Sequence, residues 1–157
     1  MELHDWLMFF HILGAIVWVG AVILTNAMMA RVGRGPDQTA VLRLASELEW
    51  VGPRVIGPSA LVVIGLGIWL VPVEEGLAFS QLWIWLSLLL VAVTMLQNGI
   101  YSAPESKRIA RLAEERGAEA REVRRRLSRL LWLGRLDLLI LVAVVWLMVF
   151  KPGGPSD

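Results

Sequence analysis

The 157-residue chain contains no cysteine and only two histidines, His4 and His11. Without a thiol, this chain can form no disulfide, no thiolate metal site and no iron–sulfur cluster of its own. Charged residues make up only 18% of the sequence, whereas 57% of the residues are hydrophobic. This balance excludes an ordinary soluble domain and indicates an integral membrane protein.

Several signatures of chemistry are absent as well. The sequence has no Ser/His/Asp arrangement, no pair of acids within an apolar segment and no phosphate-binding loop. Its basic segments lack the interleaved aromatic residues that favour nucleic-acid binding. We therefore expect a protein that contacts the lipid bilayer, binds no nucleic acid and is not an enzyme by itself.

Long apolar segments dominate what is present. A helix needs about 20 largely apolar residues to cross the ~30 Å hydrocarbon core of a bilayer. Four segments qualify, at about residues 6–30, 55–73, 81–101 and 130–150. Acidic residues and no basic leader precede the first of them, so we expect it to be retained and not cleaved as a signal peptide. The sequence predicts an all-α, four-helix membrane bundle, with residues 1–157 forming one domain.

Basic residues are concentrated in two of the connecting segments. Residues 102–129 contain nine Lys or Arg against five Glu, and residues 31–54 contain four Arg against three acids. The positive-inside rule places both segments in the cytoplasm and both termini outside. Hydrophobic periodicity predicts an amphipathic helix in each, over about residues 36–51 and 105–127, with a break at Gly117 in the second.

Tryptophan is frequent, and its positions relate to membrane depth. Trp6, Trp83 and Trp85 lie near the predicted outer ends, and Trp50 and Trp132 near the inner ends, as in the aromatic belts of membrane proteins. We expect the remaining three to lie deeper and to pack within the bundle: Trp18, Trp69 and Trp146.

Polar side chains within the segments gather towards their inner ends. Ionisable groups at membrane depth usually face the bundle interior and pair with one another. We therefore predict that Asp137 forms an ion pair with Arg54 or Arg135. We expect three carboxamides, from the first and third segments, to join the inner ends of the helices: Asn26, Gln97 and Asn98.

Four stretches carry a family resemblance: LHDWLMFFHILGAIVWVG (3–20), RVIGPSALVVIGLGIWLV (54–71), FSQLWIWLSLLL (79–90) and RLDLLILVAVVWLMVFKPG (135–153). With these, nearly the whole chain resembles an uncharacterised bacterial family of predicted integral membrane proteins. More distantly it is similar to CopD-like copper-resistance membrane domains and to HemJ-like protoporphyrinogen oxidases, through the run from His11 to Gly20. The resemblance implies a helical domain of the bacterial inner membrane and a b-type haem held by the first-helix histidine. The chain lacks the lysine that HemJ-like enzymes carry early in the third helix, so the resemblance does not predict porphyrinogen oxidation by this chain.

His11 lies about five residues into the first span, where an unpaired imidazole is costly to bury. His11, Gly14, Trp18, Ala21 and Thr25 fall on one helical face. This stripe of small residues permits either close approach of another helix or a flat macrocycle against the backbone. The two hypotheses are therefore a histidine hydrogen-bonded across a packing seam, and an axial ligand of haem b with Gly14 and Trp18 at the edge of the ring.

The sequence restricts a second haem ligand. His4 and His11 are seven residues apart on one helix, or about 10.5 Å along its axis, so they cannot be trans ligands of one iron. Met148, at a depth similar to that of His11, is the candidate thioether ligand. Alternatively, its side chain only fills the core. The remaining choices are five-coordination or a histidine from another chain, such as a second copy or a membrane redox partner.

Copper binding competes for the same helix. His4, Met8 and His11 recur on one face of the first segment, and imidazole and thioether groups suit copper. Three ligands spread over two turns need help from another helix to surround one ion. The alternative function is therefore a copper-handling or cofactor-free membrane protein that acts as a subunit or through partners.

Overall fold

The computed structural model describes residues 3–32, 40, 43, 44, 47, 50–74, 76–117 and 120–153. Within these residues every regular element is helical, and the predicted all-α fold is confirmed. In chain order the elements are α1 (Leu3–Val32), a π-helical turn η1 (Gly52–Ile56), α3 (Gly57–Val73), α4 (Leu82–Gln97), a second π-helical turn η2 (Asn98–Ser102), α5 (Ala103–Arg116) and α6 (Arg121–Phe150).

Four continuous helical segments are long and apolar enough to cross a membrane: Leu3–Val32, Gly52–Val73, Leu82–Arg116 and Arg121–Phe150. They contain the predicted spans almost completely. With a rise of 1.5 Å per residue, the 30 residues of α1 or α6 extend about 45 Å, more than the ~30 Å of hydrocarbon. The helices therefore project beyond the bilayer core.

Two prolines account for the π-helical turns. A proline within a helix lacks an N–H, and its ring clashes with the carbonyl four residues earlier. That carbonyl belongs to Arg54 for Pro58 and to Ile100 for Pro104, and each lies in the widened turn, η1 or η2. Widening relieves the clash without ending the helix, so α4 runs through η2 into α5.

The second amphipathic segment therefore differs from the prediction at both ends, because its last residues, from Arg121, are the first turns of α6. It begins as a continuation of the third span and not as a separate loop helix. The predicted break is confirmed, because α5 ends at Arg116 and Gly117 has a φ of +80°. The amphipathic helix predicted over residues 36–51 lies mostly outside the described residues.

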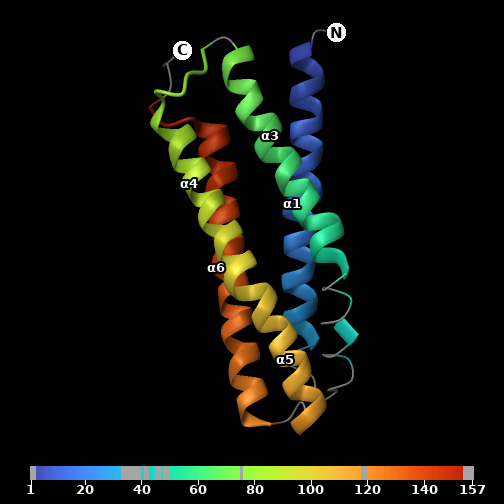
Figure 1. Cartoon of the computed structure of the whole chain (residues 1–157). Coiled ribbons are helices and arrows are strands. Elements are labelled where there is room, and N and C mark those ends of the chain that lie inside the picture. Colours follow the sequence, from blue (N-terminus) through green and yellow to red (C-terminus); the bar gives the residue numbers. More distant parts are fainter. Residues whose placement is uncertain are drawn as a thin grey trace.

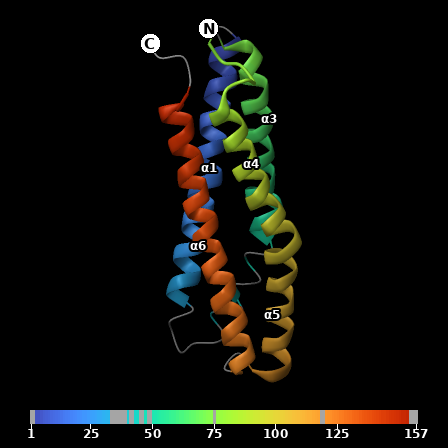
Figure 2. The ribbon, with the colours of Figure 1, turned by 90° about the vertical axis from the view of Figure 1, so that its left-hand side faces the viewer.

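The helices form two antiparallel pairs. α1 packs mainly on α3, α4 packs mainly on α6, and α1 also contacts α6. Figures 1 and 2 show that the start of α1 and the end of α6 lie at one end of the bundle, while α5 lies at the other. At the first end, Lys151 Nζ is 3.7 Å from Glu74 Oε1, which ties the end of α6 to the end of α3.

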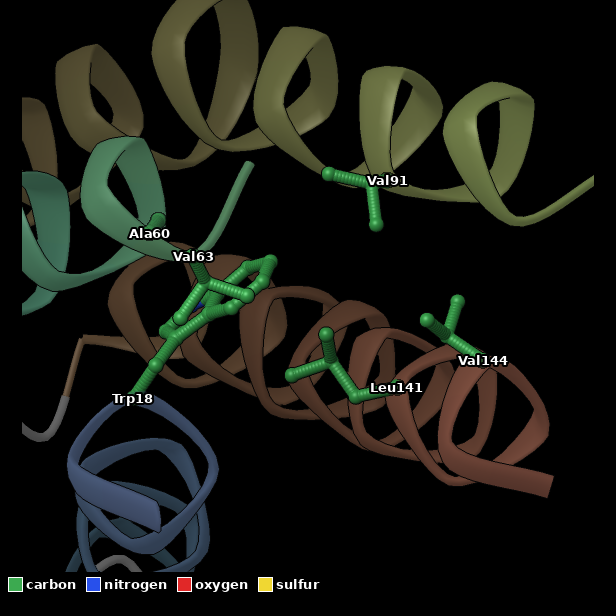
Figure 3. Packing of buried hydrophobic residues seen from close by; sticks show 6 residues of the cluster. All are labelled: Trp18, Ala60, Val63, Val91, Leu141 and Val144. Atoms are coloured by element: carbon green, nitrogen blue, oxygen red, sulfur yellow. The ribbon is translucent and has the colours of Figure 1, made fainter. Parts of the chain in front are cut away.

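The apolar core is thin and draws on all four spans. Its central cluster contains one residue of α1, two of α3, one of α4 and two of α6 (Figure 3): Trp18, Ala60, Val63, Val91, Leu141 and Val144. A second cluster lies towards the end that carries the termini: Val71, Trp83, Ile84 and Leu147. A third joins α5 to the start of α6: Ile109, Ala113 and Val123.

Most large apolar side chains on the spans are exposed, as expected where lipid replaces water. The tryptophans correct part of the prediction. Trp18 is buried as expected, but Trp69 and Trp146 are 54% and 51% exposed, whereas Trp83 packs inside at 7%. Trp69 and Trp146 lie within one turn or so of their helix ends, so they take belt positions instead of core positions.

Candidate functional site

His11 is buried on the face of α1 that meets α3. Its Nδ1 lies 2.9 Å from the backbone carbonyl oxygen of Val63. Because a carbonyl can only accept, this contact places the ring proton on Nδ1, which donates, and leaves Nε2 of a neutral ring as a free base. The structure thus fixes the tautomer and the orientation of the imidazole.

Two glycines make this contact geometrically feasible. A Cβ added at Gly67 would lie 3.0 Å from Cε1 of His11, so the absent side chain leaves room for the ring. A Cβ added at Gly14 would lie 2.9 Å from Cγ2 of Val63. At Gly20 and Gly65, in the same two helices, an added Cβ would meet nothing within 4 Å. Close approach of α1 and α3 is therefore concentrated at Gly14 and Gly67.

The face predicted to hold either a helix or a macrocycle is occupied by α3. Gly14 packs against Val63, and Trp18 belongs to the central apolar cluster. Both residues therefore contact other helices, as expected for a packing seam. Met148 is partly buried against the central and second clusters, and its role as a ligand stays a prediction.

The other proposed copper ligands lie near the start of α1. The Nδ1 atom of His4 is buried and has no hydrogen-bond partner within the described part of the chain. Met8, one turn further, is partly buried. Across the described ranges, no group of three or more His, Asp or Glu side chains is placed to hold a metal ion. A copper site here would therefore depend on the imidazole and thioether groups.

A second polar cluster surrounds Asp137, which is only 5% exposed. Its Oδ2 accepts hydrogen bonds from Nδ2 of Asn98 at 2.8 Å and from Nε2 of Gln97 at 3.2 Å. Its Oδ1 is buried and has no hydrogen-bond partner among the residues that the structure describes. Asn98 also donates to the Thr94 carbonyl, 2.9 Å away. The prediction that Gln97 and Asn98 join the helices at this level is confirmed, and they do so through Asp137.

The predicted ion pair of Asp137 is wrong. Among the residues that the structure describes, no arginine pairs with Asp137. Arg54 instead lies over the Trp50 ring, with Cζ 5.0 Å from the ring centroid. Arg135 is exposed, because a residue two positions away on a helix points about 200° around the axis from Asp137.

Asn26 does not join the Asp137 cluster. Its Nδ2 donates to the Val22 carbonyl 2.9 Å away, one turn earlier in α1. Its side chain fills the space above Gly134, where an added Cβ would come within 2.5 Å of Oδ1. Asn26 therefore contributes to the packing of α1 on α6, apart from Gln97 and Asn98.

An open groove of about 460 Å³ lies beside this cluster, between the α4–η2 segment and α6. Gln97 belongs to the cluster and to the groove, since its side-chain amide donates to Asp137 and the residue also lines the groove. The remaining lining residues are Tyr101, Arg129, Trp132, Leu133 and Leu136. A polar cluster inside the bundle thus has a neighbouring opening to its surroundings.

Three participants were not foreseen from the sequence. The Val63 carbonyl carries no side-chain signal, because any residue supplies one. Gly67 stands out in sequence only as a small residue that permits tight packing, and Gly134 as a small residue one turn before Asp137. Spacing within one helix cannot reveal which residue of another helix lies opposite, so these pairings needed the three-dimensional structure.

Comparison with known proteins agrees with the membrane architecture. Residues 5–152 match a family described as predicted integral membrane protein (DUF2269). No curated protein and no solved structure matches the chain. The more distant resemblance to CopD-like and HemJ-like proteins stays a prediction. Since the match covers nearly the whole sequence, the chain belongs to the DUF2269 family of integral membrane proteins.

Proposed function

We propose that this protein binds haem b in the bacterial inner membrane, with His11 as an axial ligand, and acts in electron transfer, redox sensing or haem handling. The observation that supports this is the 2.9 Å contact between Nδ1 of His11 and the Val63 carbonyl. Histidines that bind a metal commonly donate their second ring nitrogen to a backbone carbonyl, which fixes the tautomer and raises the basicity of the free nitrogen.

The residues around His11 fit haem b only in part. Nε2 of His11 is the ring nitrogen that does not contact the Val63 carbonyl, so it is the atom that would bind iron, and Gly67 leaves room for the imidazole. Gly14 and Trp18 do not fit as the lining of a ring, because α3 and the central cluster occupy their face. The proposal therefore assigns one axial ligand to this chain and no pocket within the α1–α3 seam. Haem b, when bound, supplies a one-electron redox centre.

The remaining coordination position has two candidate sources. His4 lies about 10.5 Å from His11 along the axis of α1 and cannot serve the same iron from the same chain. The sequence contains no further histidine. We propose that the position is filled by Met148 or by a histidine of a second copy or of a membrane redox partner, or that it stays open, and the spectrum of the Met148→Leu variant tests the role of Met148.

The test compares matched histidine variants. The His11→Ala protein should lose the Soret band of haem-loaded protein, whereas His4→Ala should retain it. Met148→Leu should shift the spectrum and lower the reduction potential only if its thioether is a ligand. Circular dichroism should show that all three variants remain helical. A Soret band that persists unchanged in His11→Ala would contradict the proposal.

Copper handling is a second candidate, and a different observation favours it. The buried Nδ1 of His4 has no hydrogen-bond partner, so it is an uncompensated acceptor or donor near the thioether of Met8. Imidazole and thioether together suit Cu(I). If His4 and Met8 bind copper, the His4→Ala and Met8→Leu proteins should retain less copper through dialysis than the wild type. Equal retention in both variants and the wild type would eliminate it.

A further inference from the structure

We propose that Asp137, Gln97 and Asn98 form a proton-binding site, in which the carboxyl group of Asp137 is held neutral at neutral pH. The site exchanges its proton at the α5 end of the bundle, next to the groove lined by Gln97. This inference is independent of His11 and of haem. It concerns a cluster whose carboxyl oxygen Oδ1 is both buried and without a partner.

The hydrogen bonds are distributed unevenly over the carboxyl group. Both amides donate to Oδ2, and Oδ1 receives none. An ionised carboxylate spreads its charge over both oxygens and needs donors or cations at each when it leaves water. Neutral amides on one oxygen leave the other uncompensated. The neutral acid avoids this cost, because it carries no net charge.

Among the residues that the structure describes, no cation forms an ion pair with Asp137. α4 and η2 have no charged residue, and their one titratable group is Tyr101. Charged groups on the other elements at this end include Arg31 of α1, Arg54 of η1, Glu105 of α5, and Arg126, Arg129 and Arg135 of α6, and further charged residues lie along α5 and the first turns of α6. Glu105 is already paired with Arg126 at 2.6 Å, and none of the described ion pairs includes Asp137.

The two carboxamides suit both states of the carboxyl group. Each amide has donors on nitrogen and an acceptor oxygen. In the present arrangement the nitrogens donate to Oδ2, which also suits the carbonyl oxygen of a neutral acid. Rotation of one amide would present its oxygen to the O–H of the acid. The cluster can therefore gain or lose a proton by side-chain rotation, without rearranging the helices.

The groove provides a route to the site. It has a volume of about 460 Å³ and is lined by Gln97, whose amide contacts Asp137, and by Arg129 and Tyr101, which are exposed. The groove itself is largely apolar, so the amide of Gln97 is the polar group that links the buried acid to this opening. Asp137 is thus one side chain away from the surroundings of the bundle, unlike a carboxyl group sealed in the apolar core.

Infrared spectroscopy of the purified protein in lipid nanodiscs tests the proposal directly. At neutral pH we expect a carboxylic-acid C=O band that shifts in D₂O, disappears at alkaline pH and is missing in Asp137→Asn. The matched control Glu105→Gln should keep the band, since Glu105 forms a salt bridge with Arg126 and does not contact Asp137 in the described hydrogen bonds. Absence of a band attributable to Asp137 at neutral pH would overturn the proposal.

A second pair of variants keeps the test valid if Asp137→Asn fails to fold. Asp137→Glu should retain an acid band at a changed frequency. Asn98→Leu removes a donor that stabilises the ionised form, so its band should persist to a higher pH than in the wild type. If Asn98→Leu leaves the pH range of the band unchanged, the amide does not control protonation and the proposed site is wrong.

Discussion

Val63 shows how one residue can organise a helix contact in several ways. Its carbonyl accepts a hydrogen bond from Nδ1 of His11, its Cγ2 occupies the space beside Gly14, and its side chain belongs to the central cluster. Gly67, one turn further along α3, leaves room for the imidazole. A polar side chain is thus satisfied inside a seam formed by small residues, which is the ordinary basis of helix association in lipid.

A leucine at Gly67 should disturb this seam. Its Cβ would already lie 3.0 Å from Cε1 of His11, so the larger side chain must displace the ring from the Val63 carbonyl. We expect a loss of about 1–3 kcal/mol in stability, typical of overpacking, measured by thermal unfolding in detergent. The matched control is Gly65→Leu, where an added Cβ meets nothing within 4 Å. Equal losses in both variants would refute a specific role for Gly67.

Asp137 and Glu105 offer a contrast between two carboxyl groups. Asp137→Asn removes no ion pair among the described residues, and an asparagine oxygen can still accept from Asn98 and Gln97, so we expect a smaller loss of stability than in Glu105→Gln. Glu105→Gln breaks the 2.6 Å pair with Arg126, whose side chain is 25% exposed. That variant should lower the melting temperature, because glutamine keeps at most a neutral hydrogen bond in place of the charge-assisted one. Melting temperatures that fall in the opposite order would contradict this assignment.

At the scale of elements, sequence reasoning identified the spans and failed where two helices had to be aligned. The apolar segments were long enough to be recognised one at a time, and Gly117 identified the break before α6. The continuation of α4 through η2 was missed, because Pro104 is usually a helix boundary and here is absorbed by a π-helical turn. Asp137 was assigned to an arginine because depth along a helix was known and direction around it was not.

The hairpin of α5 and α6 depends on a small apolar contact outside the four-helix core. Ile109 and Ala113 pack against Val123, which is 2% exposed. Ile109→Ala should cost about 2–5 kcal/mol in local stability, because it leaves a cavity where packing is needed. Limited proteolysis near Gly117 should therefore accelerate. The exposed neighbour Arg108 provides the control, and if Arg108→Ala accelerates cleavage as much, the apolar contact does not hold the hairpin.

At the scale of the whole molecule, the basic α5–α6 end and the end that carries the termini lie at opposite ends of the bundle. The excess of Lys and Arg in residues 102–129 then favours the cytoplasm for the α5–α6 end. The native chain has no cysteine, so single substitutions can report each side without background.

We predict that Ser80→Cys, in the exposed loop between α3 and α4, reacts with an impermeant thiol reagent in intact cells. Glu115→Cys, exposed near the end of α5, should react only after the membrane is permeabilised. Both substitutions lie outside the packed core, so neither should alter folding. The reverse labelling pattern would place the termini in the cytoplasm and contradict the orientation.

The proposed function depends most on whether His11 binds the iron of a haem. The most direct measurement is the visible spectrum of wild-type protein purified from cells supplied with haem, followed by a pyridine haemochrome assay. Our proposal predicts a Soret band that copurifies with the helical protein and a haemochrome of the b type. A folded, pure protein with no Soret absorption would contradict it, and would leave His11 as a buried residue that joins α1 to the Val63 carbonyl of α3.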